Sequence, residues 1–388
     1  MQHVYLDHSA TTPLAPEVYE AMRPHFLENF GNASSVHSFG RRAKLALEES
    51  REEIAKFIGA RYDEVYFTSG GTEADNHAVA GIYAAVSDTD RKHVITSAVE
   101  HHAVLHAAEA LRTRGASLTV LPVDRFGRVS VSDVRKSLTA KTALVSIMHA
   151  NNEVGTIQPI EEIGRCAHDK GVAVHSDTVQ TLGKVPIDAR TMNVDLMAFS
   201  AHKIYGPKGI GAIYIRKGTK LEAFLKGGAQ ESNRRAGTEN VPLAVGFAKA
   251  VSLCRERMEQ DNAKFRTLGE FLRGKISADF EGAIFNGDPA NCLPNIVSVS
   301  FDSKLSNVDG EALIMGMDLQ GVAVTSGSAC SSGSMEPSHV LLAMGRDPKT
   351  ARATIRFSLG RSTTEQDLEF AVAALKQVVA NMQPVSAH

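Results

Sequence analysis

The chain has 388 residues, of which 43% are hydrophobic and 22% charged, the composition of an ordinary globular protein long enough for about two domains. A formal net charge of −2 gives no basic surface, so we expect neither nucleic acid nor a membrane surface as a partner. No apolar segment is long enough to cross a bilayer, and no basic region followed by an apolar run opens the chain, so we expect no signal peptide.

The first part of the chain predicts a strand, a glycine turn and a helix in succession. A strand over 64–68 leads into a Ser-Gly-Gly-Thr-Glu turn at 69–73, and a helix is expected from about Ala74 to Val86. The first free N–H groups of such a helix point into the turn, where the helix dipole favours a phosphate. Thr72 could add a hydroxyl, although a plain capped helix would give the same pattern.

A histidine cluster follows the next predicted strand, which covers residues 93–97. His102 and His106 would share one face of the helix that starts here, but no third ligand is evident, so we expect no metal site. His101 lies at the junction between strand and helix and is better placed to face a pocket.

Strands predicted over 142–147, 172–176 and 195–199 continue the alternation with helices. The alternation predicts an α/β fold with a largely parallel sheet and helices on both faces, and ligands bind at the carboxyl ends of the strands in such sheets. The residues that follow predicted strands include Gly71, Thr72, His101, Asn152, Asp177, Gln180 and Lys203. Taken singly, Asn152 could be a turn residue, Asp177 a helix cap and Gln180 a surface amide. Their common place at strand ends predicts one ligand pocket.

Lys203 stands between the strand over 195–199 and a Gly/Pro turn, directly after Ser200 and His202. A strand end holds a side chain rigidly, and burial lowers the pKa of a lysine, so this amine could form a Schiff base with an aldehyde cofactor. The alternative for an isolated motif of this kind is a surface lysine in a loop.

A long helix, from about 241 to 276, is predicted to lead into a second, smaller α+β domain. We expect strands in it near 296–301, 322–325 and 354–358, and helices near 310–320 and 364–382.

A stretch rich in serine and glycine, at about 325–335, carries Cys330. This composition predicts a mobile loop, and because reactive thiols occupy accessible positions we expect a function for Cys330 rather than a linker with an incidental thiol. Cys166, Cys254 and Cys292 are expected in the core or on helices. The four cysteines form no Cys-x-x-Cys pair, which fits the reduced thiols of a cytoplasmic protein.

Eight short motifs occur in one order over nearly the whole chain. They are Ala10-Thr11-Thr12-Pro13, Thr68-Ser69-Gly70-Gly71-Thr72-Glu73, Glu100-His101, Asn151-Asn152-Glu153-Val154-Gly155, Ala201-His202-Lys203, Arg235-Ala236-Gly237-Thr238, Gly327-Ser328-Ala329-Cys330 and Ile355-Arg356-Phe357-Ser358-Leu359. In this set the chain resembles the cysteine desulfurases of the NifS/IscS-like branch, pyridoxal phosphate (PLP) enzymes of the aspartate-aminotransferase fold type. It departs mildly at Ser331 and Thr325, where many relatives carry threonine and serine. The long loop resembles the extended-loop branch, not the short-loop branch similar to selenocysteine lyases.

The resemblance implies PLP fold type I, with a mostly parallel seven-stranded sheet in a large domain over 14–257. Residues 1–13 and 258–388 would form the small domain, and two chains would form a homodimer. The implied reaction takes sulfur from L-cysteine, leaves L-alanine and puts a persulfide on Cys330. An iron–sulfur scaffold or another sulfur-acceptor protein would then receive the sulfur, in a general or a nitrogen-fixation role.

The resemblance also implies roles for single residues. Lys203 would carry PLP as a Schiff base, Asp177 would pair with the pyridinium nitrogen, Gln180 would donate to the phenolate oxygen, and His101 would stack on the ring and move protons. The phosphate would be bound by Gly71, Thr72, Ser200 and His202, and by Thr238 of the other subunit. Asn152 and Arg356 would hold the substrate carboxylate. No resident metal is expected, although Cys330 could transiently ligate a shared iron–sulfur cluster.

Three other functions fit parts of this pattern. A small-amino-acid aminotransferase of the same fold would explain Lys203, Asp177 and the phosphate loop, but it does not need Cys330. A selenocysteine lyase would differ in its preference for selenium over sulfur. A non-catalytic sulfur carrier would use Cys330 alone and bind no PLP.

Overall fold

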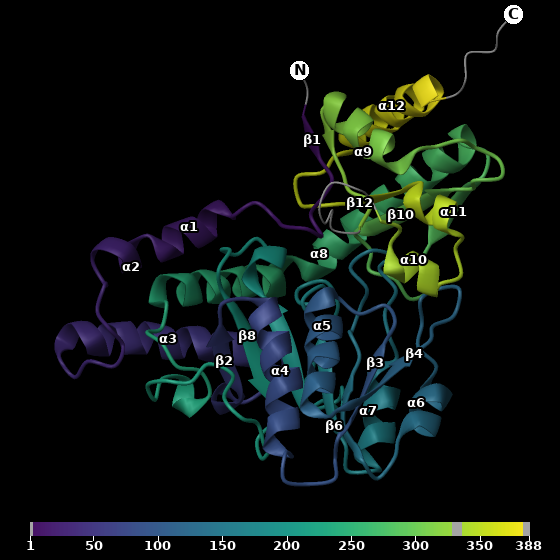
Figure 1. Ribbon diagram of the computed structural model, residues 1–388. Coiled ribbons are helices and arrows are strands. Elements are labelled where there is room, and N and C mark those ends of the chain that lie inside the picture. The colour runs from purple at the N-terminus through teal and green to yellow at the C-terminus, as the bar shows by residue number, and fades with distance from the viewer. Residues whose placement is uncertain (1–2, 328–335, 383–388) are drawn as a thin grey trace, which may run out of the picture.

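A computed structural model gives the positions of residues 3–327 and 336–382, and a seven-stranded sheet lies at the centre of its larger half (Figure 1). The strand order is β2-β8-β7-β6-β5-β3-β4. The strands are β2 (Val65–Thr68), β3 (His93–Ser97), β4 (Ser117–Leu121), β5 (Thr142–Ser146), β6 (Ala173–Asp177), β7 (Leu196–Ser200) and β8 (Gly211–Ile215). The neighbouring pairs are parallel except those of β8, which is antiparallel to both β2 and β7. The predicted α/β class and the mostly parallel sheet are confirmed.

Helices cover both faces of this sheet. They are α1 (Pro16–Met22), α2 (Pro24–Leu27), α3 (Ser38–Phe57), α4 (Gly71–Ala85), α5 (His102–Ala110), α6 (Val131–Ser137), α7 (Ile160–His168) and α8 (Val241–Asp279). Successive strand residues point to opposite faces, so Met197 and Phe199 of β7 pack with α3, α7 and α8. Leu196 and Ala198 of the same strand pack with α4 and α5 on the other face.

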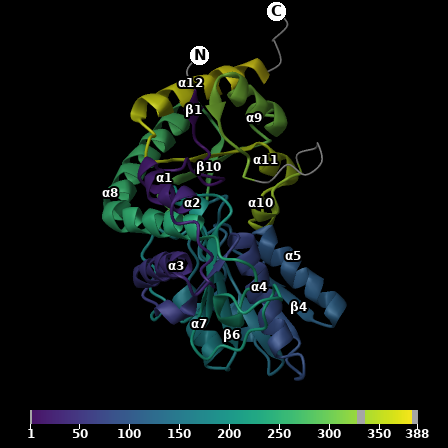
Figure 2. The same ribbon diagram turned by 90° about the vertical axis from the view of Figure 1, so that its left-hand side faces the viewer.

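A smaller α+β unit carries both ends of the described chain. It has a three-stranded antiparallel sheet in the order β12-β10-β9 and a parallel pair of β1 with β11. The strands are β1 (Val4–Tyr5), β9 (Ala283–Asn286), β10 (Ile296–Phe301), β11 (Val322–Ala323) and β12 (Thr354–Ser358), and the helices are α9 (Gly310–Leu319), α10 (His339–Ala343), α11 (Pro348–Arg352) and α12 (Glu365–Met382). Both views show α9 and α12 at one end of the molecule and α7 and β6 at the other (Figure 1, Figure 2).

The helix α8 joins the two hydrophobic cores. Its first half packs into the core of the large sheet, up to Cys254, and its second half packs into the small core from Phe265 onward. At the other end of the chain, Leu6 belongs to the small core and Val18 to the large one. The expected large domain, 14–257, begins between Leu6 and Val18 and ends between Cys254 and Phe265. These domain limits stay a prediction. No helix of the described residues is long and apolar enough to span a bilayer.

Two elements differ from the expectation in a way that matters for the site. The helix α4 begins at Gly71 rather than near Ala74, with Gly70 as its N-cap, so the glycine turn itself supplies the first helical N–H groups. The strand expected over 322–325 ends at Ala323, and Thr325 instead forms an isolated bridge with Arg356 of β12.

Candidate active site

One pocket, with a volume of about 380 Å³, lies at the carboxyl ends of the parallel strands. Ten of the twelve predicted site residues line it, namely Gly71, Thr72, His101, Asn152, Asp177, Gln180, Ser200, His202, Lys203 and Arg356. The other lining residues are Ser9, Ala10, Asp75, Met148, Val179, Thr325 and Gly327. Segments from the N-terminus and β12 therefore meet the strand ends of the large sheet at one place, whereas the strand-end pattern concerned the large sheet alone.

Lys203 ends a short 3₁₀ turn that follows β7. Its Nζ donates hydrogen bonds to the carbonyl oxygens of Ser9, at 2.6 Å, and Ala10, at 2.8 Å. Burial and the nearby Arg356 lower the pKa of Lys203 to about 8, although Asp177 acts in the opposite direction. The neutral, nucleophilic amine is therefore far more populated near neutral pH than it is for an ordinary lysine.

Asp177 and His101 both line the pocket, and each affects the pKa of the other. Asp177 closes β6, and its Oδ1 accepts a hydrogen bond of 2.9 Å from the backbone N–H of Val179. Burial raises the pKa of Asp177, while His101 and Lys203 oppose that shift by favouring the carboxylate. His101 caps α5 with Nδ1, which accepts from the Ala103 N–H at 3.1 Å, and burial lowers the pKa of the imidazole. The neutral ring therefore carries its proton on Nε2.

Asp75 lines the pocket but was not predicted from the sequence. It lies on α4 with 1% of its surface exposed, and its Oδ1 is 3.4 Å from Nε2 of His175. Burial raises the pKa of Asp75, and the nearby Asp177 and Glu100 raise it further. The sequence feature that could have identified Asp75 is its position four residues after Gly71, one helical turn further along α4.

The N-terminus of α4 forms a cradle that fits a phosphate group. A Cβ added at Gly71 would lie 2.6 Å from Cγ2 of Val179, so only a glycine leaves the cradle open. Glu73, in the same helical turn, is held by hydrogen bonds from the Ser69 N–H and from Arg235, so its carboxylate is already engaged. Free N–H groups with hydroxyls nearby suit an anion with several oxygens.

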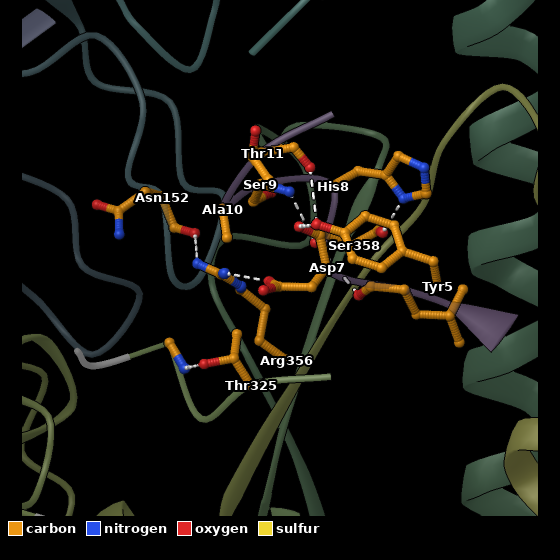
Figure 3. Close-up of polar contacts among 12 residues, drawn as sticks. Tyr5, Asp7, His8, Ser9, Ala10, Thr11, Asn152, Thr325, Arg356 and Ser358 are labelled. Atoms are coloured by element: carbon orange, nitrogen blue, oxygen red, sulfur yellow. Dashed lines mark hydrogen bonds and ion pairs between the residues drawn. The ribbon is translucent and has the colours of Figure 1, made fainter. Parts of the chain in front are cut away.

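Arg356 reaches the pocket from β12 with 4% of its side chain exposed. Figure 3 shows its guanidinium between Asn152 and Asp7. Nη1 donates to the backbone oxygen of Asn152 at 2.7 Å, and Nη2 lies 2.8 Å from Oδ1 of Asp7. The contact with Asp7 was not predicted, because the two residues are 349 positions apart in the sequence.

The comparison with known proteins decides the family. Residues 4–370 match the family model of class-V aminotransferases. The chain is 47% identical to the cysteine desulfurase IscS of Dictyoglomus turgidum, over 99% of this chain and 96% of that protein. It is 42% identical to the cysteine desulfurase NifS of Azotobacter vinelandii, over 100% of this chain and 95% of that protein. This chain belongs to the class-V aminotransferases, among the IscS/NifS cysteine desulfurases.

Solved structures agree with this class-V assignment. A NifS-like protein superposes with a TM-score of 0.91 at 35% identity, covering 98% of this chain and all of that chain. SspA, solved in complex with cysteine, gives 0.82 at 34% identity, covering 92% of this chain and 98% of that one. The predicted resemblance is confirmed, and so is fold type I, the fold of a family of PLP enzymes.

Gln180 lines the pocket, and one of its polar atoms has no partner among the described residues. Its Nε2 donates to the carbonyl oxygen of Ser9 at 2.9 Å, while Oε1 is buried and has no partner among the described residues. Its second Nε2 hydrogen and Oε1 both remain for a ligand, so the role toward a phenolate oxygen stays a prediction.

Two predicted site residues, Thr238 and Cys330, remain to be placed. Thr238 is exposed, beyond the pocket formed by its own chain. Cys330 lies outside the described residues, whereas Gly327, three positions earlier, lines the pocket.

The other three cysteines are poorly suited to act as nucleophiles. Cys166 and Cys254 are buried, and Cys292 is partly buried, as expected. Burial raises the pKa of Cys254 and of Cys292 to about 11, which leaves few thiolates at neutral pH.

Proposed function

We propose that this chain is a PLP-dependent cysteine desulfurase, which takes the sulfur of L-cysteine and releases L-alanine. The observation that carries the proposal is the convergence of a lysine of lowered pKa, a buried carboxylate and a buried arginine in one pocket at the strand ends. These are the groups needed for an aldehyde cofactor, its ring nitrogen and an amino-acid carboxylate.

The residues present fit pyridoxal phosphate. Gly71, Thr72, Ser200 and His202 would hold its phosphate, Asp177 its pyridinium nitrogen, Gln180 its phenolate oxygen and Lys203 its aldehyde carbon, with His101 against the ring. The open cradle at Gly71 and the second Nε2 hydrogen of Gln180, which its hydrogen bond to Ser9 leaves free to donate, support this assignment. When bound, the cofactor draws electrons away from the substrate and weakens the bonds around its α-carbon.

Arg356 and Asn152 would bind the carboxylate of L-cysteine and fix the direction of its side chain. The amine of Lys203, once free, then removes the α-proton, which its lowered pKa favours near neutral pH. His101 moves further protons. Because Nδ1 is engaged by Ala103 at a long 3.1 Å, that weak hydrogen bond must open whenever Nδ1 takes up a proton.

Cys330 would receive the sulfur. Its thiolate attacks the substrate sulfur, so that an S–S bond forms as the C–S bond of the substrate breaks. The electron pair of the broken bond stays with the carbon, which gains a proton and leaves as alanine. The position of Gly327 supports this role, because three residues span at most about 11 Å and Gly327 lines the pocket.

The working unit is a cytoplasmic homodimer that passes the persulfide sulfur to an iron–sulfur scaffold or another acceptor protein. Exposed apolar side chains are concentrated near the N-terminus, at Leu14, Tyr19, Phe26, Leu27, Phe30, Val36, Phe39 and Leu45. Such a concentration is typical of a protein interface and supports a second copy of the chain there. Thr238, exposed in one chain, would reach the phosphate of the partner's site.

The test is the product balance with L-cysteine as the sole substrate. A desulfurase forms L-alanine without any keto acid and, with a thiol reductant present, releases sulfide in equal amount. Pyruvate as the product, or activity that requires a keto acid, would show a different reaction at the same pocket. A much higher rate with selenocysteine would indicate a lyase for selenium.

A further inference from the structure

Asp7 contacts the buried arginine of the pocket and has no role in the function proposed above. It follows β1 and forms a β-bridge with Ser358 of β12. Arg356 lies two residues before Ser358 on β12, so the bridge places Asp7 beside Arg356 (Figure 3). The hydroxyl of Tyr5 donates to the backbone oxygen of Asp7 at 3.1 Å. The backbone of Asp7 is therefore held by hydrogen bonds, and this fixes the position of its carboxylate beside the guanidinium.

Arg356 has five N–H donors, and the described residues engage two of its three nitrogens. Nη1 is bound by the Asn152 carbonyl and Nη2 by Asp7, while Nε is buried without a partner. Its backbone is fixed as well, through the N–H that donates to Thr325. A ligand carboxylate thus meets a guanidinium that is already oriented and already paired with one negative charge.

The binding of a second carboxylate at Arg356 is made less favourable by electrostatic repulsion from Asp7. Asp7 and the ligand share one positive charge, and the pocket is too buried for water to screen their repulsion fully. The guanidinium would bind a carboxylate more tightly if Asp7 were neutral. Since L-alanine carries the same carboxylate as L-cysteine, such tight binding would also delay the release of the product.

We propose that Asp7 is a positioning residue that sets the affinity of the pocket for amino-acid carboxylates, by orienting Arg356 and competing for its charge. This inference rests on the proposed function, in which Arg356 holds the substrate carboxylate. Through Asp7, the N-terminal segment lowers the affinity of the pocket for both substrate and product.

The test is the affinity of the holoenzyme for L-alanine, measured by calorimetry, together with the steady-state constants for L-cysteine. Asp7→Asn removes the charge and keeps the shape and the acceptor oxygen. We expect it to bind L-alanine about tenfold more tightly, the order expected for one charge a few ångströms away in a partly buried site. KM and kcat for L-cysteine should fall together, because product release becomes slower.

Asp279→Asn is the matched control. Asp279 also makes an ion pair of 2.8 Å, with Lys376, but it lies away from the pocket, so L-alanine affinity should not change. If the Asp7→Asn chain does not fold, Asp7→Ser removes the same charge, leaves room for water and should show the same gain in affinity.

Arg356→Gln separates the two proposals. If it binds L-alanine as tightly as the wild type, the carboxylate site of the proposed function is wrong. The other decisive outcome is that Arg356→Gln no longer binds L-alanine, whereas the folded Asp7 variants bind it with unchanged or lower affinity than the wild type. In that case the proposed function stands and the role of Asp7 is overturned.

Discussion

Opposing influences on one amine set the chemistry at the residue scale. Burial and Arg356 lower the pKa of Lys203, whereas Asp177 and Asp7 raise it. The carbonyl oxygens of Ser9 and Ala10 hold the ammonium form by two short hydrogen bonds. With a pKa of about 8, the amine can be both a nucleophile and a proton carrier near neutral pH.

Lys203→Ala removes the amine that would join the cofactor. We expect the purified variant to lack the visible absorbance of a PLP–lysine Schiff base, because no other lysine lines the pocket among the described residues. The measurement is an absorbance spectrum after dialysis, with the wild type as the reference. A variant that stays yellow would contradict the assignment.

The pKa of Lys203 predicts a pH dependence for cofactor capture. Only the neutral amine attacks an aldehyde, so the rate at which the cofactor-free protein binds PLP should rise with pH and level off above about pH 8. Asp177→Asn should move the plateau to lower pH, because that carboxylate raises the pKa of Lys203. A wild-type rate that still climbs beyond pH 10 would indicate an ordinary, solvated lysine.

At the scale of elements, the site depends on how a helix starts beside a strand end. The first turn of α4 and the segment that follows β6 approach so closely that Val179 leaves no room for a Cβ at Gly71. The glycine at this position therefore serves close approach, and the N–H groups that follow it face the pocket.

Gly71→Ala should weaken PLP binding by about tenfold or more, since overpacking a tight contact costs on the order of 1–3 kcal/mol. The additional replacement Val179→Ala should recover most of the affinity by making room for the new methyl group. Gly274→Ala, in an exposed part of α8 where a Cβ meets nothing within 4 Å, is the control and should bind PLP normally. Equal affinities for all three would mean that the phosphate lies elsewhere.

Local sequence patterns predicted most of the elements that bear the site, and they failed where the contacts are long-range. The positions of Asp177 at the end of β6 and of Lys203 shortly after β7 follow from short apolar runs, which depend on neighbouring residues alone. The pair of Asp7 with Arg356 joins the two ends of the chain, and no local pattern encodes it. Asp75 was missed for a different reason, because an acidic residue in the first turns of a helix is also a common structural feature.

At the scale of the whole molecule, two exposed features fit the proposed homodimer. Thr238 is exposed and lies outside the pocket of its own chain, and the apolar side chains near the N-terminus are exposed as well. Both features are explained if a second copy covers the N-terminal surface and receives Thr238 in its site.

A mixture of two defective chains tests this arrangement. Lys203→Ala and Thr238→Val dimers should each bind PLP poorly, the first at both sites for lack of the amine and the second for lack of the hydroxyl. In a mixed dimer, one site would combine a normal Lys203 with a normal Thr238. Tight PLP binding should therefore return in the mixture, and its absence in verified mixed dimers would place Thr238 outside the site.

The most direct measurement of the central claim is where the sulfur goes in a single turnover. The holoenzyme is given L-cysteine in the absence of reductant, and its peptides are analysed by mass spectrometry. We predict one added sulfur atom on the peptide that contains Cys330 and an equal amount of L-alanine. Added sulfur on Cys166, Cys254 or Cys292, with Cys330 unchanged, would contradict the account.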